Sequence, residues 1–237
     1  MEHKVYQRYI KNASEHWWWN ARIEIFSGII ETYFKYNRNL NILDYGAGSG
    51  VNINFLKNYG KVTIFEPHLP TSNYLRENYK EIKLLENKNV KFDLILLADV
   101  LEHIEHTHQV LDQLSIYMHS QSILLITVPA HQYLFNKKDL TLKHYRRYSK
   151  KLLFNDLKNS GFYLDYLSYY NFFLSPIILP ITLISKILKL NYIEKVEKKP
   201  HFILNKIFFN LFRLEKYLIS KKIKLPYGIS LIAIAKK

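Results

Sequence analysis

Apolar residues recur along the chain with two spacings, one typical of helices and one typical of strands. Between Trp17 and Tyr36 large apolar side chains return every three or four positions, which predicts an amphipathic helix. The short, almost wholly apolar runs that follow are typical of strands buried on both faces of a parallel sheet. These runs span residues 41–45, 62–65, 82–85, 92–98 and 123–128, and stretches with helical spacing lie between them at 52–59, 70–79 and 106–118. The alternation predicts an α/β protein with helices on both faces of its sheet.

The last hundred residues add a helix, two strands and a long segment between the strands. A helix is predicted over 150–160, with Gly161 at its end, and strands over 162–170 and 229–235. The segment between these strands is too long for a hairpin loop and too apolar for disorder. It predicts two helices, over 172–190 and 201–220, on either side of the charged stretch 194–199. The predicted domains are therefore a core of residues 1–170 and 227–237 and a helical insertion of residues 171–226.

One glycine-rich loop has the composition of a ligand site. The sequence Leu43-Asp-Tyr-Gly-Ala-Gly-Ser-Gly50 places an acidic residue at the end of a strand, before three glycines in alternate positions. Glycines let a backbone turn tightly and approach a ligand closely, and the helix that follows presents free N–H groups. The spacing fits neither a dinucleotide loop, G-x-G-x-x-G, nor a phosphate loop that ends in G-K-[ST].

The pattern D-x-G-x-G-x-G resembles motif I of the class I S-adenosylmethionine-dependent methyltransferases. Two further landmarks extend the resemblance. Glu66 ends the predicted second strand, where that family has an acidic residue that binds both ribose hydroxyls, and Phe92–Ile104 matches the family's fourth-strand segment F-D-x-I-x-x-x-D-V-L-E-H-I. The resemblance implies a Rossmann-like, seven-stranded class I methyltransferase sheet with a helical insertion between its last two strands. It also implies S-adenosylmethionine as cofactor and S-adenosylhomocysteine as product.

The same resemblance assigns the cofactor contacts. The glycine loop would surround the methionine and ribose parts, and the end of the second strand would hold the ribose. Glu86 or Asn87 would lie near the adenine, although Glu86 fits a surface carboxylate equally well, and Ala98 or Asp99 would lie near the methionine end. The cofactor-binding residues are thus predicted to be Asp44, Gly46, Ala47, Gly48, Gly50, Glu66, Pro67, Glu86, Asn87, Ala98 and Asp99.

The segment after the fifth strand resembles a subgroup of bacterial methyltransferases. Residues 129–148 match the pattern P-A-x-x-x-L-[WF]-x-x-x-D-x-x-x-x-H-x-R-R-Y. An N-terminal H-[WF]-W-[WF] stretch followed by an Arg is matched by His16–Trp19 with Arg22, and a terminal P-[FY]-G-x-S-L strand by Pro226–Leu231. The resemblance therefore spans almost the whole chain, and it implies that the acceptor side of the site lies in these segments.

Methyl transfer requires alignment of the acceptor and removal of its proton. His144 is the candidate general base, because imidazole titrates near neutrality, and Asp139 the residue that orients it. A structural polar network that holds the loop is the alternative for His144. Arg146 and Arg147 would clamp a carboxylate or phosphate of the acceptor, or pair with Asp139 and Glu102 instead. Tyr148, Trp18 and Arg22 complete the predicted acceptor site, with core packing as the alternative for the tryptophans.

No metal site is expected. His103, Glu105, His106 and His108 lie near Asp99 and Glu102 in sequence, but ligands on one helical face are usually three or four residues apart. The Asp-Val-Leu-Glu-His-Ile string also has a place in the methyltransferase fold. Since the chain has no Cys, a thiolate metal site, a disulfide framework and a cysteine nucleophile are excluded.

The net charge of +14 suggests an anionic partner. Most of the basic residues are Lys, as a coding bias would also produce, but residues 186–237 alone carry 13 basic and 3 acidic side chains. Nucleic acid is the less favoured partner. No RNA-binding module is appended, and Ala98-Asp-Val-Leu stands where base N-methylating enzymes have an Asn-Pro-Pro-Tyr-type string. The alternative to an enzyme is a non-catalytic subunit that has the fold and binds the cofactor but transfers no methyl group.

The predicted insertion begins with 14 uncharged residues, 172–185, which include two prolines. The apolar run is shorter than a membrane-spanning helix requires. Two roles stay open: a lid over a small-molecule or lipid-like acceptor, or a surface in peripheral contact with an anionic membrane. The N-terminus lacks the apolar core of a secretory signal, so the expected location is the cytoplasm, with membrane contact at its inner face.

Overall fold

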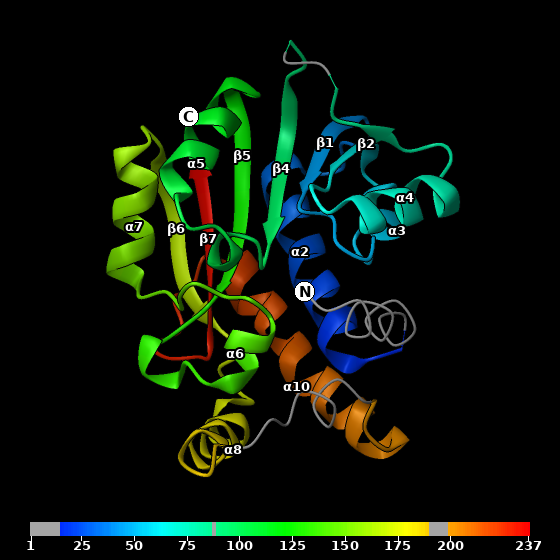
Figure 1. Ribbon diagram of the computed structural model, residues 1–237. Coiled ribbons are helices and arrows are strands. Elements are labelled where there is room, and N and C mark those ends of the chain that lie inside the picture. The colour runs from blue at the N-terminus through cyan, green and yellow to red at the C-terminus, as the bar shows by residue number, and fades with distance from the viewer. Residues whose placement is uncertain (1–14, 87–88, 190–198) are drawn as a thin grey trace. The chain divides into compact units, whose positions relative to one another are not determined.

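Within residues 15–86, 89–189 and 199–237, which the computed structural model describes, seven strands form one sheet in the order β3-β2-β1-β4-β5-β7-β6 (Figure 1). The first five strands pair in parallel with their neighbours, whereas the arrow of β7 runs opposite to that of β4. The strands are β1 Leu40–Tyr45, β2 Gly60–Phe65, β3 Lys83–Leu84, β4 Phe92–Ala98, β5 Met118–Pro129, β6 Tyr163–Tyr170 and β7 Ser230–Lys236. The predicted α/β Rossmann-like sheet is confirmed.

The centre of the sheet is the pair β1 and β4, whose side chains are buried on both faces. Ile42 lies opposite Leu94 and Leu43 opposite Ile95, and all four side chains are at most 1% exposed. Strands β2 and β3 lie beside β1 on one side of this pair, and β5, β7 and β6 lie beside β4 on the other. In open α/β sheets ligands bind beyond the carboxyl ends of the strands at such a switch point. Asp44 and the glycine loop lie at this position.

The helices follow the predicted order with one marked difference. The predicted helix over 52–59 is reduced to the four residues of α3, because the chain must turn at once into β2 at Gly60. A Cβ atom at Gly60 would lie 2.0 Å from the carbonyl oxygen of Leu40, so only glycine fits this turn. The other helices are α2 Trp17–Phe34, α4 Leu69–Asn78, α5 Thr107–Ile116, α6 Lys137–Thr141, α7 Lys150–Asn159, α8 Ser175–Ile187 and α10 Phe202–Ser220.

The chain separates into two compact units. The first, the sheet unit, comprises residues 37–128, 150–167 and 232–237. The second, the helical unit, has described residues 15–36, 129–149, 168–189 and 199–231. Of the charged stretch predicted at 194–199, all but Lys199 lies outside the described residues. The division into a core and an insertion of residues 171–226 stays a prediction.

The core of the helical unit is the contact between α2 and α10. The ring of Trp18 stacks on Phe212 with centroids 5.1 Å apart, and Trp17 meets Phe208 edge-on at 5.5 Å. A Cβ atom at Gly28 would lie 2.4 Å from Ser220 Oγ, so glycine allows the two helices to approach closely. Aromatic packing of this kind explains why the sequence places its tryptophans together at the start of α2.

A buried carboxylate fixes the start of α8 to α10. Glu215 accepts hydrogen bonds from the backbone N–H groups of Asn171, Phe172 and Phe173, at 2.6, 2.7 and 3.1 Å. Burial raises the pKa of Glu215 to about 7, against the three N–H donors, which lower it. Nothing in the sequence pattern indicates this contact, because its partners are more than forty residues apart.

Candidate active site

The glycine loop after β1 has three residues in the left-handed region of backbone space. Gly46, Gly48 and Gly50 have φ angles of 76°, 54° and 77°. A Cβ at Gly46 would lie 2.7 Å from Val100 Cγ2, and one at Gly50 would lie 2.8 Å from Leu75 Cδ2. A Cβ at Gly48 meets only the Gly46 carbonyl oxygen, at 3.9 Å. The outer glycines are therefore required by packing, whereas Gly48 leaves open space beside the loop.

Glu66 lies at the end of β2 and contacts this loop directly. Its Oε2 accepts a hydrogen bond from Gly48 N at 2.8 Å, and its Oε1 accepts one from His68 N at 3.0 Å. The loop is also tied to β2 by the N–H groups of Gly46 and Ala47, which donate to the Phe65 carbonyl at 2.7 and 3.1 Å. The sequence-predicted ribose ligand and the glycine loop are thus brought together, and Pro67 follows them as an exposed residue.

Two aspartates lie at the ends of strands β1 and β4 in the sheet unit. Asp44 is 1% exposed, and the Asn52 amide donates to its Oδ1 at 3.5 Å. Asp99 follows Ala98 at the end of β4 with a φ of 58°, and its Oδ1 accepts a hydrogen bond from Thr127 Oγ1 at 3.1 Å. A non-glycine residue in this conformation is uncommon and is typical of functional loops. Sequence reasoning did not identify Thr127 or Asn52 as supports.

Glu86, one of the two predicted adenine neighbours, follows β3 and is exposed. It lines a cavity of about 670 Å³ together with side chains of β3 and of the end of α4. Asn87, the other candidate, lies outside the described residues. The adenine contacts therefore stay a prediction.

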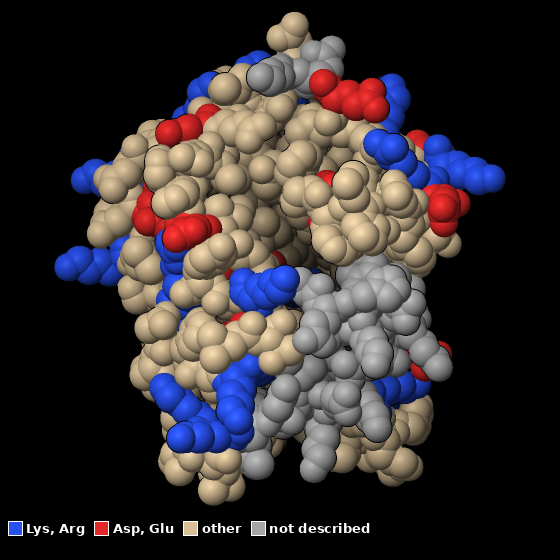
Figure 2. Space-filling model, in the orientation of Figure 1, with Lys and Arg blue, Asp and Glu red and all other residues tan. Residues whose placement is uncertain are grey.

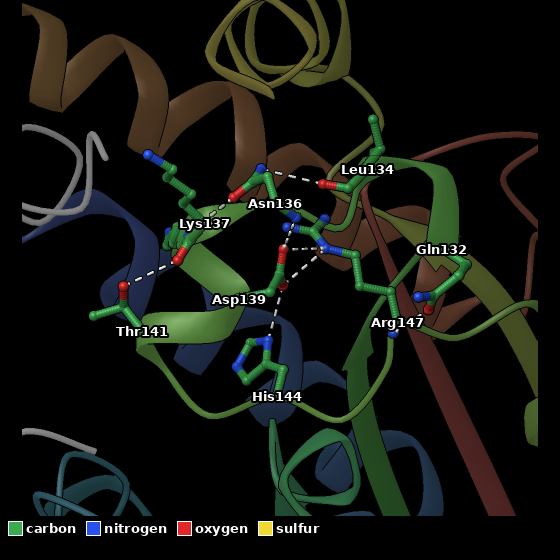
Figure 3. Close-up of polar contacts among 9 residues, drawn as sticks. Gln132, Leu134, Asn136, Lys137, Asp139, Thr141, His144 and Arg147 are labelled. Carbon is green, nitrogen blue, oxygen red and sulfur yellow. Dashed lines mark hydrogen bonds and ion pairs between the residues drawn. The ribbon is translucent and has the colours of Figure 1, made fainter. Parts of the chain in front are cut away.

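In the helical unit, Asp139 gathers the predicted catalytic residues of the loop after β5 (Figure 3). His144 Nδ1 lies 2.9 Å from Asp139 Oδ1, and Arg147 Nε donates to both carboxylate oxygens at 2.9 and 3.0 Å. The aspartate is held by a capping box at the start of α6: its Oδ2 accepts from Asn136 N at 2.9 Å, and the Asn136 side chain accepts from Lys138 N. The predicted pairing of His144 with Asp139 is present.

The electrostatics of this cluster define the tautomer of the histidine. The Asp139 side chain is 2% exposed, and burial alone would raise its pKa. The hydrogen bond from His144 and the Arg147 guanidinium outweigh burial and lower the pKa of Asp139 to about 2. A carboxylate can only accept hydrogen bonds, so His144 donates to Asp139 from Nδ1.

The other residues predicted to bind the acceptor differ in burial and in the side chains that they contact. Arg147 forms the alternative ion pair, with Asp139. Tyr148 is fully buried, and its backbone pairs with Pro129 and His131 to close the loop. Trp18 is half-buried and stacks on Phe212, the Arg22 guanidinium lies 5.6 Å from the Phe26 ring centroid, and Arg146 is half-buried. Their substrate roles stay predictions.

Sequence reasoning missed an aromatic cluster in the same unit. The His131 ring lies 5.1 Å from that of Tyr169 and 4.7 Å from that of Tyr227, and these two rings are 5.9 Å apart. The Tyr133 hydroxyl bonds to that of Tyr227 at 2.7 Å. His131 also has a φ of 67°, and its Nε2 lies 2.9 Å from the Gly228 carbonyl oxygen. The cluster joins three segments that no local pattern connects. By contrast, the spacing Asn136-x-x-Asp139 is a capping signal that was open to detection.

Comparison with known proteins assigns the chain to a family. The model of a family described as "Methyltransferase domain" matches residues 18–167, and the chain belongs to this family. None of the curated proteins matches the chain in sequence.

Solved structures show the same fold at low sequence identity. A methyltransferase from Mesorhizobium loti that depends on S-adenosylmethionine has a TM-score of 0.59 at 12% identity, over 95% of this chain and 100% of that one. One from Archaeoglobus fulgidus scores 0.55 at 13% identity, over 91% and 94%. A coclaurine N-methyltransferase, solved with N-methylheliamine and S-adenosylhomocysteine, scores 0.55 at 12% identity, over 90% and 70%.

The protein is therefore an S-adenosylmethionine-dependent methyltransferase, and the residues present fit this cofactor. A Cβ at Gly48 would meet only the Gly46 carbonyl oxygen, at 3.9 Å, so the backbone leaves room beside Gly48, which we call the cradle, for a ligand to approach. Glu66 contacts the loop at this point, where its carboxylate accepts a hydrogen bond from Gly48 N–H. The predicted cofactor is thus consistent with both the family and the geometry. The individual contacts stay predictions.

Glu66→Ala is expected to weaken binding of S-adenosylhomocysteine by about 10-fold to 100-fold, since one charge-assisted hydrogen bond contributes about 1.5–3 kcal/mol. The variant also removes the acceptor for Gly48 N–H and so loosens the loop. Equilibrium dialysis with labelled ligand measures the change. Glu77→Ala, an exposed glutamate of α4, is the control and should bind as the unaltered protein does. Equal affinity in both variants would show that Glu66 is not the ribose ligand.

Proposed function

We propose that this methyltransferase methylates a hydroxyl group of a small-molecule, lipid or lipid-linked saccharide acceptor, with His144 as general base. The observation that supports the proposal is the buried hydrogen bond between His144 Nδ1 and Asp139 Oδ1. A hydroxyl must lose its proton as its oxygen forms the new bond. An imidazole whose Nδ1–H is held by a carboxylate presents Nε2 for that proton in a fixed orientation.

Each residue of the cluster has a defined part in this proposal. S-adenosylmethionine supplies an electrophilic methyl group when bound. His144 takes the acceptor proton at Nε2, and Asp139 stabilises the imidazolium that results. Arg147 fixes the carboxylate through Nε, and its backbone N–H donates to Gln132 Oε1 at 2.8 Å, which anchors the loop at a second point. Asp139 and Arg147 are therefore positioning residues.

His144→Ala is expected to lower methyl transfer by about 10²–10⁴-fold, the usual contribution of a general base, while S-adenosylhomocysteine still binds. The assay follows labelled methyl groups from the cofactor into separate lipid, small-molecule and RNA fractions. His119→Ala is a matched control, because His119 Nε2 pairs with Asp93 in the sheet unit at 3.1 Å. It should transfer methyl groups at the unaltered rate.

Three results would contradict the proposal. An unaltered rate of methyl transfer by His144→Ala would show that His144 is not the general base. Label found in RNA alone would identify the rival acceptor class, which the net charge of +14 suggests. A product methylated on an amine would show that the enzyme methylates nitrogen and not a hydroxyl oxygen. The name of one structural neighbour, coclaurine N-methyltransferase, gives an example of methylation on nitrogen.

A further inference from the structure

Helix α8 leaves several apolar side chains exposed to solvent, whereas its buried side chains carry hydroxyl groups. Residues exposed on α8 and just beyond its end recur at helical spacing, with exposed fractions between 45 and 60%, and form what we call the apolar stripe: Ile177, Ile181, Ile184 and Leu188. The buried side chains of the helix are Ser175, Thr182 and Ser185. A helix that packs on a protein core normally buries its apolar side instead.

The buried hydroxyls of α8 bond to backbone carbonyls of their own segment. Ser175, Thr182 and Ser185 donate to the backbone carbonyls of Phe172, Ile178 and Ile181 at 2.8 Å or less. Each of these three hydroxyls therefore has an acceptor within its own segment. The apolar stripe is the part of the helix that still requires a partner, because exposed aliphatic area of this extent is unfavourable in water.

The first two turns of α10 repeat this pattern. Phe202, Ile203, Leu204 and Ile207 are each 45–68% exposed, although the later turns of the same helix pack on α2. In Figure 1 α8 and the start of α10 both lie at the lower end of the helical unit. Aliphatic and aromatic side chains on two helices of one unit thus face solvent.

Lysine side chains border both apolar surfaces. Lys186 and Lys189 lie at the end of α8, and Lys206 lies among the exposed residues of α10. Figure 2 shows Lys and Arg side chains gathered beside the tan surface at the position of α8. The surface therefore combines exposed apolar area with positive charge.

We propose that the apolar stripe and the start of α10 dock on the surface of an anionic lipid bilayer. Aliphatic side chains would enter the boundary between headgroups and acyl chains, and the lysines would contact lipid phosphates. Among the described helices none has the length and apolar character needed to cross a bilayer, so contact is peripheral. A second copy of the chain is the less favoured occupant, because it would bring a second lysine-rich surface against the first.

Vesicle flotation of the full chain tests this directly. Vesicles of phosphatidylcholine with phosphatidylglycerol should carry the protein at low salt, and those of phosphatidylcholine alone should carry much less. Raising the salt concentration should weaken binding, since surface charges are screened. Ile184→Glu should reduce binding about tenfold or more, because burial of one aliphatic side chain contributes about 1.5–3 kcal/mol.

The matched control is Ile116→Glu, because Ile116 of α5 is exposed to the same extent as Ile184, 54%, but lies in the sheet unit. It should bind vesicles as the unaltered chain does. The proposal would be overturned if both substitutions reduced vesicle binding equally. It would also be overturned if the unaltered chain bound none of the vesicles. A dimer that Ile184→Glu dissociates, without vesicle binding, would identify a second copy as the occupant. Vesicle binding needs no acceptor, so the test is independent of the His144 proposal.

Discussion

Asp139→Ala is expected to lower the free energy of unfolding by about 3–5 kcal/mol, the usual loss when one partner of a buried ion pair is removed. The substitution leaves the Arg147 guanidinium, whose side chain is 11% exposed, without its carboxylate, and it removes the acceptor for Asn136 N–H. Chemical denaturation measures the loss. Asp165→Ala is the control, because Asp165 pairs with Lys236 at a longer distance of 3.8 Å and nearer the surface. It should cost no more than about 1 kcal/mol.

The same carboxylate predicts an acid dependence of stability. The pKa of Asp139 in the folded state is about 2, below its ordinary value of 3.8. Its stabilisation is therefore fully present above pH 3.8 and is lost as the pH falls through about 2, and it amounts to about 2 kcal/mol. Denaturation of Asp139→Ala should depend less on pH in this window than that of the unaltered protein. If the stability of the two proteins changed equally with pH, the stabilising role of Asp139 would be contradicted. The same would hold if Asp139→Ala lost no more free energy of unfolding than Asp165→Ala does.

Gly48→Arg is expected to reduce the affinity for S-adenosylhomocysteine by more than about 100-fold. The Cβ direction at Gly48 points into the open space beside the loop, so a long side chain there would occupy the cofactor cradle. The φ of 54° adds a cost of about 1–2 kcal/mol for a non-glycine residue. Equilibrium dialysis with labelled cofactor measures the change.

Gly161→Arg is the matched control for this substitution. Gly161 has a φ of 77° at the end of α7, and a Cβ there would meet nothing within 4 Å. The same residue change in the same backbone region therefore adds strain without filling the cradle. Affinity should be kept in Gly161→Arg, and an equal loss in the two variants would show that strain, and not occupation of the site, is responsible.

The sequence predicts the sheet well because its signals are local. Each buried strand is a short apolar run, and the order of strands and helices follows from the alternation of two spacings. The helix predicted over 52–59 fails because the close approach of Gly60 to Leu40 depends on strand pairing, which no local pattern contains. The periodicity also does not predict that α8 leaves several isoleucines exposed, since apolar residues at helical spacing are expected to face the core.

The candidate site was predictable where a motif fixes the spacing. Glu66 and the glycine loop meet because both follow adjacent parallel strands, β2 and β1. Asp139 and His144 meet because Asp139 lies in the short helix α6 and His144 follows just after its end. The stacking of His131 on Tyr169 and Tyr227 and the cap by Glu215 were not predictable, because their partners come together only through the tertiary fold.

Calorimetric titration of the intact protein with S-adenosylhomocysteine tests the central assignment most directly. The cradle at Gly48 and the carboxylate of Glu66 predict saturable binding with one site per chain. Heat that saturates at this stoichiometry would establish the cofactor site and justify the search for hydrophobic acceptors. No detectable binding to the intact protein, at ligand concentrations that saturate other methyltransferases, would contradict the assignment of the glycine loop.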